Sequence, residues 1–238
     1  MKRVGIIGGI SAESTAHYYA LINQGVRAGR GGLAQAELLI WSVNFAEVAA
    51  LQEQGDWPKL ARRFADIARR LEGAGAEAIV IAANTMHKVA DEVTAAVTIP
   101  LLHIVDITAD AIRRAGLARP GLMATAYTME QDFYVGRFRD RHGLNLLIPG
   151  AADRRDTHRI IYDELCRGIT TEASRARYEA IARALVAQGA DCLILGCTEI
   201  GMLLNEDNVP VPVFDTTRLH TQAAVDFALS DVRRQAAE

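Results

Sequence analysis

The sequence predicts an α/β protein made of two similar lobes, each built around a mainly parallel sheet. Short apolar runs, typical of buried strands, alternate along the chain with longer segments of helical periodicity, which is the pattern of βα units. The segment from Ile67 to Ala83 returns as the segment from Ile181 to Cys197, at a constant offset of 114 residues. Two copies of one βα pattern indicate two lobes of the same construction.

Composition limits the classes of protein to which the chain can belong. Of its 238 residues, 50% are hydrophobic and 23% are charged, so the chain can bury the core of one large domain or of two small ones. The formal net charge is −3 and the basic residues are scattered, which argues against a nucleic-acid or anionic membrane partner. The apolar stretch at residues 4–9 is too short for a signal peptide or a membrane span. We therefore expect a cytoplasmic protein with no membrane segment.

The apolar runs locate the predicted strands, and the helices fall between them. The predicted strands are residues 4–7, 37–43, 78–82, 101–104, 121–124, 145–148, 191–195 and 212–214. Helices over residues 60–72 and 175–187 carry apolar residues three and four apart. Each is followed by a glycine, Gly73 or Gly189, which we expect in the left-handed conformation that ends helices.

The repeat also predicts the domain organisation. We place lobe 1 at residues 1–104 and lobe 2 at residues 105–218. The terminal helix, residues 219–238, is expected to return to lobe 1. No low-complexity tract or linker interrupts either lobe.

The cysteines indicate thiol chemistry. The chain has three cysteines, Cys166, Cys192 and Cys197. Because their number is odd and no two are in CxxC spacing, the sequence argues against a disulfide framework and against a metal site. Cys197 directly follows a predicted strand, where α/β folds place active sites, whereas the same register in lobe 1 holds Ala83. We expect a helix to begin after Cys197 and its dipole to lower the pKa of the thiol. Cys192 lies inside the strand and is interpreted as structural, while Cys166 is open to either interpretation.

The glycine-rich loop at residues 8–14 matches neither the dinucleotide motif nor the P-loop motif. It is interpreted as a tight turn before a helix. The backbone amides of that helix start, near Ser11, could hold a small anion such as a carboxylate.

Four motifs together resemble the cofactor-independent aspartate/glutamate racemase family, and the resemblance runs nearly end to end. They are GGISAEST at 8–15, NTMH at 84–87, TMEQDFY at 128–134 and GCTE at 196–199. The resemblance implies two flavodoxin-like lobes with a pseudo-twofold repeat and the active site in the cleft between them. It also implies a homodimer that uses neither a metal nor any other cofactor.

The resemblance further implies how the site works. In this family one cysteine from each lobe faces the substrate α-carbon, and the second of these maps onto Cys197, which acts on the L-enantiomer. The first maps onto Ala83, and a methyl group cannot transfer a proton. The sequence therefore resembles a subgroup that lacks the first catalytic cysteine, with proton abstraction biased towards L-substrates. Cys166 stands where relatives often carry a lysine that binds the side-chain carboxylate, and Arg167 could replace that lysine.

The predicted binding residues carry hydroxyl, amide or carboxylate groups suited to an amino-acid substrate. They are Ser11, Gln52, Asn84, Thr85, Thr125, Thr128, Thr198 and Glu199. His87 either polarises the site or packs in the core, and no chemistry is assigned to His103 or His220.

Three functions remain open. The first is a racemase or epimerase of aspartate or glutamate that uses Cys197 as its acid/base group. The second is a one-thiol lyase or decarboxylase of the same superfamily, since protonating a carbanion from one face needs a single acid. The third is a catalytically silent member that binds its ligand without turnover. In each case the expected partner is a small amino acid or dicarboxylate.

Overall fold

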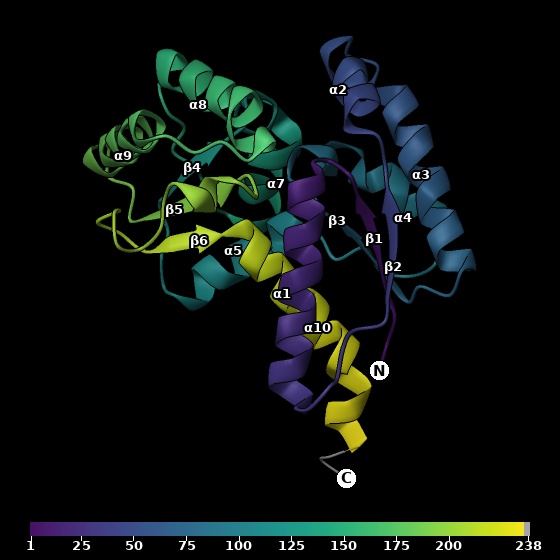
Figure 1. Ribbon diagram of the computed structural model, residues 1–238. Coiled ribbons are helices and arrows are strands. Elements are labelled where there is room, and N and C mark those ends of the chain that lie inside the picture. Colours follow the sequence, from purple (N-terminus) through teal and green to yellow (C-terminus); the bar gives the residue numbers. More distant parts are fainter. Residues whose placement is uncertain (236–238) are drawn as a thin grey trace. The chain divides into compact units, whose positions relative to one another are not determined.

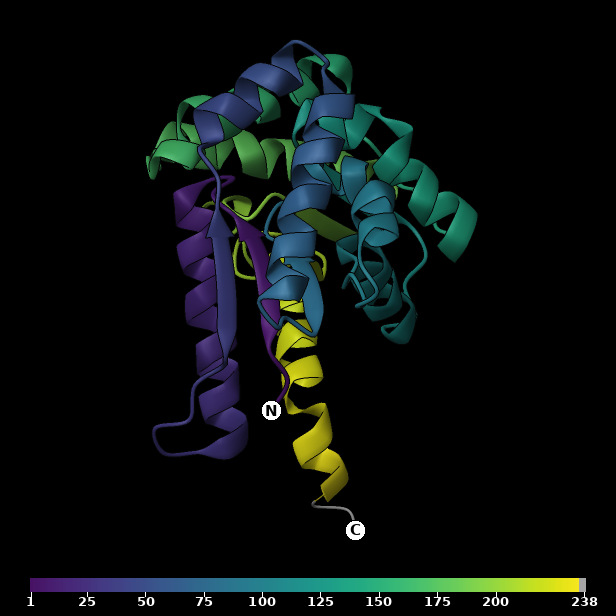
Figure 2. The same ribbon diagram turned by 90° about the vertical axis from the view of Figure 1, so that its right-hand side faces the viewer.

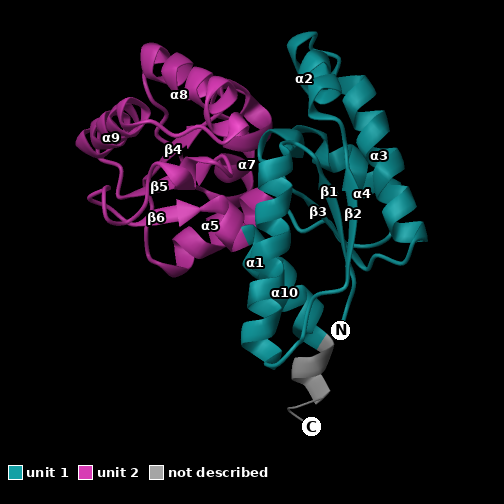
Figure 3. Ribbon diagram, in the orientation of Figure 1, with its two compact units in different colours: residues 1–103, 220–238 teal, residues 104–219 magenta. Residues whose placement is uncertain are grey.

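The computed structural model describes residues 1–235, so the last three residues of the predicted returning segment lie outside the described part. The chain divides into two compact units, shown in different colours in Figure 3. Unit 1 comprises Met1–His103 and His220–Glu238, and unit 2 comprises Ile104–Leu219.

Unit 1 is a three-stranded parallel sheet of order β2-β1-β3 with helices on both faces (Figure 1). Its elements are β1 (Val4–Gly8), α1 (Ala12–Arg30), β2 (Leu38–Ser42), α2 (Phe45–Glu53), α3 (Trp57–Gly73), β3 (Ala78–Ile81), the 3-10 helix η1 (Thr85–Val89), α4 (Ala90–Ala96) and most of α10 (Thr216–Gln235). Leu101 adds a single parallel bridge to Ile79 of β3.

Unit 2 repeats this construction with sheet order β4-β5-β6. Its elements are α5 (Ile104–Arg114), β4 (Pro120–Ala124), α6 (Ala126–Glu130), α7 (Asp132–His142), α8 (Ala151–Asp163), the 3-10 helix η2 (Leu165–Arg167), α9 (Glu172–Ala187), β5 (Cys192–Gly196), the 3-10 helix η3 (Ile200–Met202) and β6 (Val213–Asp215). Leu147 adds a single parallel bridge to Gly121 of β4. The predicted α/β class with two parallel-sheet lobes is confirmed.

Two of the predicted strands are not strands in the structure. Each of the segments 101–104 and 145–148 pairs through one residue, Leu101 or Leu147. The amide of Leu102 donates to Ile79, which in turn donates to Pro100. Leu147 itself accepts from the amide of Leu122 and donates to Pro120, so each segment makes the bonds of one bridge only. Ile104 instead begins helix α5, and its apolar side chain is buried in a core cluster of unit 2. A short apolar run cannot distinguish these outcomes by periodicity alone.

The core of unit 1 lies on both faces of its sheet, because successive side chains of a strand point to opposite faces. Ile79 and Ile81 pack with α2, α3 and α4 on one face, whereas Val80 packs with α1 and α10 on the other. Figure 1 shows these helix groups on either side of the strands, and the turned view of Figure 2 shows α3 in front of β1. Both strand faces are apolar, as expected for a parallel sheet covered on both sides.

The glycine that ends α3 differs from the prediction. Gly73 is the last residue of the helix, and the positive φ falls on Gly75, at 98°. In the second copy of the repeat the positive φ lies on Gly189, at 97°, as predicted. Gly75 and Gly189 occupy equivalent positions of the repeat. The position of the glycine with positive φ after α3 therefore follows from the repeat, and not from the end of the helical pattern.

Two glycine substitutions in this turn should have opposite effects on stability. Gly75→Ala forces a side chain into a positive φ and should lower the free energy of unfolding by about 1 to 2 kcal/mol. Gly73→Ala has open space around the added Cβ and should be neutral or raise it by up to about 1 kcal/mol. Urea unfolding of the two variants measures the difference, and equal effects would contradict it.

Candidate active site

In unit 2 the residues that follow β5 gather two thiols and a hydroxyl around one carboxylate. The Cys197 thiol donates to Glu199 Oε2 at 3.0 Å, and the Thr198 hydroxyl donates to the same oxygen at 2.5 Å. Cys166 Sγ lies 4.0 Å from Glu199 Oε1. Glu199 is only 4% exposed. The predicted residues Cys197, Thr198 and Glu199 are therefore brought together, with Cys166 beside them.

The expected lowering of the Cys197 pKa is wrong. Burial raises the pKa of the thiol well above its usual value, and the negative charge of Glu199 and the nearby Cys166 raise it further. The helical turn that comes next after β5 is not an α-helix but the single 3-10 turn η3, Ile200–Met202. The backbone amide of Glu199 lowers the pKa of the thiol, but burial and the Glu199 carboxylate raise it more, so the protonated form is the stabilised one.

Removing the charge of Glu199 should make the Cys197 thiol more acidic. We expect Glu199→Gln to move the pH midpoint of thiol alkylation down by at least about one unit, because a neighbouring like charge disfavours ionisation. The measurement is the rate of iodoacetamide alkylation against pH in a Cys166→Ser background. Cys192 stays unreactive there, because burial raises its pKa to about 12.

The matched control is Thr198→Val. It removes the hydroxyl on the same carboxylate oxygen without a change of charge. Its midpoint should stay close to that of the parent protein. A Glu199→Gln midpoint that does not move would show that the carboxylate has no electrostatic influence on the thiol.

The start of α6 holds the two other predicted residues of unit 2. Thr125 is the N-cap, and its Oγ1 accepts from the amide of Thr128, whose hydroxyl lies 3.1 Å away. The amide of Ala126 donates to His158 Nδ1 at 3.2 Å. Because that nitrogen accepts, the ring proton of neutral His158 is on Nε2. The hydroxyl pair and the helix start form one buried polar group in unit 2.

Sequence reasoning missed the aromatic side of this group. The rings of His158 and Tyr162 lie 4.6 Å apart. Burial raises the pKa of Tyr162, and the acidic side chains of Tyr127, Cys197, Cys166 and Glu199 nearby raise it further. The signal was present in the sequence for two of these residues, because His158 and Tyr162 are four apart and so share one face of α8, whereas Cys166 lies beyond the end of that helix, in η2. Arg167, the suggested replacement for a lysine at 166, is exposed.

In unit 1 the corresponding strand end carries no thiol. Beyond β3 stand Ala83, Asn84 and Thr85, all buried. His87, in η1, places Nδ1 at 2.9 Å from the carbonyl oxygen of Ala83. The residue of unit 1 at the repeat position of Cys197 is thus an alanine, whose backbone carbonyl is hydrogen-bonded to the imidazole of His87.

Ser11 and Gln52 lie in the same unit. Ser11 is the N-cap of α1 and accepts from the amide of Ser14, while the Ser14 hydroxyl donates to Ala82 at the end of β3. These bonds fix the start of α1 to the strand end. Gln52 is 3% exposed, and its Nε2 donates to the sulfur of Met86. Both predicted residues are buried close to the segment that contains Asn84 and Thr85.

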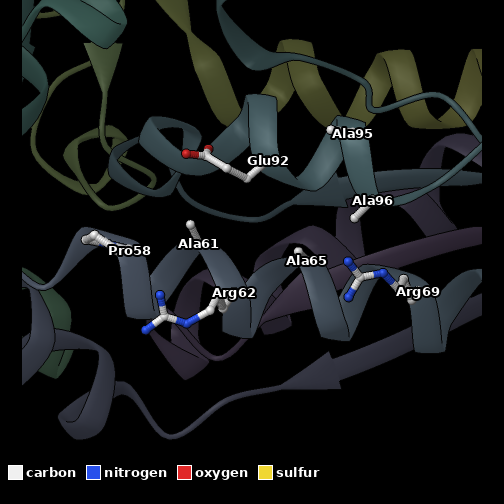
Figure 4. A pocket seen from close by; sticks show the side chains of 8 residues that line it. All are labelled: Pro58, Ala61, Arg62, Ala65, Arg69, Glu92, Ala95 and Ala96. Carbon is white, nitrogen blue, oxygen red and sulfur yellow. The ribbon is translucent and has the colours of Figure 1, made fainter.

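A separate groove of about 650 Å³ lies between α3 and α4 of unit 1 (Figure 4). Alanine side chains form much of its lining, and Arg62, Arg69 and Glu92 are its charged residues. None of the predicted site residues lines it, so we assign no acid/base chemistry to it.

Within the described part of the chain, no helix is both long and apolar enough to cross a bilayer. No group of three or more His, Cys, Asp or Glu side chains among the described residues could hold a metal ion.

Comparison with known proteins identifies the family. The model of the Asp/Glu/Hydantoin racemase family matches residues 7–224. A candidate Asp/Glu racemase from Yersinia pestis is 50% identical, with a TM-score of 0.90 over 96% of this chain and 100% of that one. An aspartate racemase homologue from Pyrococcus horikoshii OT3 is 33% identical, with a TM-score of 0.81 over 96% and 99%. The broad specificity amino-acid racemase RacX of Bacillus subtilis (strain 168) is 22% identical over 178 residues, 74% of this chain and 75% of RacX. This chain belongs to the Asp/Glu/hydantoin racemase family.

Proposed function

We propose that the protein is a cofactor-independent racemase or epimerase of acidic amino acids, in which Cys197 removes the α-proton of the L-enantiomer. The observation that carries the proposal is the Cys197 thiol, which donates to the buried carboxylate of Glu199 at the carboxyl end of β5. Strand ends of this kind are where α/β folds place their sites. Membership of the racemase family supports an isomerase.

The substrate class follows from the donors at the two strand ends and from the relatives. Thr125 and Thr128 in unit 2 and Asn84 and Thr85 in unit 1 supply hydroxyl and amide groups that suit carboxylates. Ser11, Gln52 and Thr198 complete the proposed binding set. The relatives at 50% and 33% identity are described as a candidate Asp/Glu racemase and an aspartate racemase homologue. Aspartate and glutamate are therefore the proposed substrates.

The electrostatics of Cys197 favour an amino acid over a plain dicarboxylate. In the free protein the thiol keeps its proton, because burial and the charge of Glu199 raise its pKa. Each unit of pKa costs about 1.4 kcal/mol to overcome. An α-ammonium group beside Glu199 would offset the carboxylate charge and make thiolate formation easier. The substrate would thus supply the cation that activates its own base.

Proton removal then balances as a simple transfer. In the substrate complex the thiol proton of Cys197 first leaves to solvent. The Cα–H bond then breaks, a new S–H bond forms at Cys197, and the electron pair stays on the α-carbon as a carbanion. Return of the same proton regenerates the L-enantiomer, whereas inversion needs a donor on the other face. Ala83 supplies none, so we propose that inversion is slower than exchange. We also propose that the enzyme works in the cytoplasm as a homodimer.

The deciding experiment is proton NMR of L- and D-aspartate and L- and D-glutamate in D₂O with the protein. Loss of the α-proton signal from an L-acid supports the proposal, because washout reports deprotonation even when inversion fails. No washout from any of the four, together with loss of CO₂ from a malonate-type acid, would show a lyase instead. Binding without either reaction would show a silent member.

A further inference from the structure

We propose that His158 is a positioning residue for substrate binding in unit 2. As a neutral imidazole it holds the start of α6, and with it Thr125 and Thr128, in the conformation that binds the substrate. The inference rests on the proposed function, which assigns these two hydroxyls to the binding set, and it deepens that function by making binding depend on pH. His158 itself does not touch the substrate. Its influence passes through one hydrogen bond between α8 and α6.

That hydrogen bond fixes the first residue of α6. The amide of Ala126 has no acceptor within the helix, as is general for the first turn, and it donates to His158 Nδ1 at 3.2 Å. Thr125 directly follows β4, so the sheet fixes the backbone on one side of Ala126. On the other side, the amide of Thr128 donates to the carbonyl of Thr125 at 3.0 Å. The two proposed binding hydroxyls therefore belong to a turn that is held by β4 and by His158.

The half-buried imidazole is itself held between aromatic rings of both helices. Its centroid lies 4.6 Å from that of Tyr162 on α8 and 5.7 Å from that of Tyr127 on α6, the latter edge to face. At the far end of α6, Arg154 Nε donates to Glu130 Oε1 at 2.7 Å and so joins the two helices independently of His158. A change at His158 should thus act on the start of α6 without releasing the whole helix.

Protonation of His158 would remove the acceptor. In the imidazolium both ring nitrogens donate, so Nδ1–H would face the N–H of Ala126. Burial lowers the pKa of His158 below its ordinary value of about 6.5, and the charges of Glu130 and Asp163 only partly oppose this. The ring is therefore neutral at neutral pH, and the hydrogen bond is lost as the pH falls through the pKa. Further titratable groups on the elements packed around it are Tyr127 on α6, Arg154 and Tyr162 on α8, Cys166 in η2 and Arg177 on α9, which pairs with Asp153 and Asp156.

The test compares the affinity of the unmodified protein and of His158→Asn for L-glutamate across pH, by isothermal titration. Asparagine keeps an acceptor, Oδ1, on the same Cγ atom that carries Nδ1 in histidine, but it does not titrate. One unit below the pKa of His158, the Kd of the unmodified protein should exceed that of His158→Asn by about fivefold, which corresponds to the loss of one net hydrogen bond. At about pH 8 the two values should agree within about twofold, since both proteins then have the acceptor.

The pKa of His158 is measured separately, as the midpoint of the Cε1–H signal that is missing from the NMR spectrum of His158→Asn. Comparing two proteins at the same pH cancels the titration of the substrate and of the rest of the chain. Parallel profiles of Kd against pH for the two proteins overturn the proposal.

Two further variants separate the loss of an acceptor from a general loss of structure. His158→Leu has no acceptor at any pH, so its Kd should be about fivefold above that of the unmodified protein at about pH 8. Its profile should follow that of His158→Asn, and an acid loss like that of the unmodified protein would overturn the proposal. Glu130→Gln keeps an oxygen for Arg154 but removes a charge that raises the pKa of His158.

In Glu130→Gln the NMR midpoint of His158 and the midpoint of the Kd profile should therefore move to lower pH by the same amount. A Kd midpoint that does not follow the NMR midpoint would overturn the proposal, because a purely structural role of the ring does not depend on that charge.

The failure of the proposed function is distinguishable from the failure of this inference. If the unmodified protein neither binds L-glutamate and L-aspartate nor washes out their α-protons at any pH, the proposed function fails, and the role of His158 fails with it. If washout occurs and the profiles of Kd for the unmodified protein and His158→Asn are parallel, only the role of His158 fails.

Discussion

Replacement of Cys197 by serine should abolish α-proton washout from L-aspartate and L-glutamate. A positioned acid/base group contributes about a hundredfold to ten-thousandfold to proton transfer, and a serine hydroxyl ionises far less readily than a thiol. We expect washout in D₂O to fall by at least about a hundredfold on this basis. Substrate binding should be nearly intact, because Thr125 and Thr128 remain in place on α6.

The control for this prediction is Cys166→Ala, which removes the other thiol beside Glu199. Washout in that variant should stay within about threefold of the parent, since Cys166 is not assigned the proton transfer. Isothermal titration with L-glutamate checks that Cys197→Ser still binds. Washout at an undiminished rate in Cys197→Ser would show that another group removes the proton.

The repeat made much of the fold predictable from the sequence. Strands β3 and β5 lie where the two copies of the pattern place them, because the four or five buried residues of each follow the same Gly-Ala pair, Gly75-Ala76 or Gly189-Ala190. The positive φ at Gly75 could also have been read from the register of Gly189. The structure of the segment 101–104 could not be predicted from the sequence. A short apolar run has the same pattern whether it forms a strand or, as here, a single bridging residue followed by the start of a helix.

The candidate site was predictable in its residues but not in its electrostatics. The position of Cys197 after a strand follows from the sequence. Whether its thiol meets helix amides or a carboxylate depends on how the following residues turn. Glu199, the residue before η3, places its carboxylate on the sulfur. The link from His87 to the Ala83 carbonyl is likewise a matter of side-chain conformation. The sequence pattern therefore predicts which side chains follow the strand, whereas the hydrogen bonds and burial of Cys197 determine the pKa of its thiol.

The two faces of the substrate carbon should behave unequally in the unmodified protein. In the proposed mechanism Cys197 removes the proton of the L-enantiomer, and residue 83, at the repeat position of Cys197, has only a methyl group. We expect washout from D-aspartate and D-glutamate to trail washout from the L-forms by about a hundredfold, the lower end of what one positioned base contributes. Exchange of the L-acids should therefore be fast and their racemisation slow.

Ala83→Cys should remove this asymmetry. Ala83 is buried at the end of β3, in the register of Cys197, so a thiol there is one sulfur larger than the native side chain and occupies the place of the missing base. Washout from the D-acids and the rate of inversion should both rise by about a hundredfold. Polarimetry of L-glutamate and L-aspartate beside deuterium washout of both enantiomers measures the two rates. Ala83→Ser, of similar size but without an ionisable thiol, is the matched control and should gain little. If Ala83→Cys folds and binds substrate yet gains nothing on the D-acids, the face opposite Cys197 is not served by residue 83.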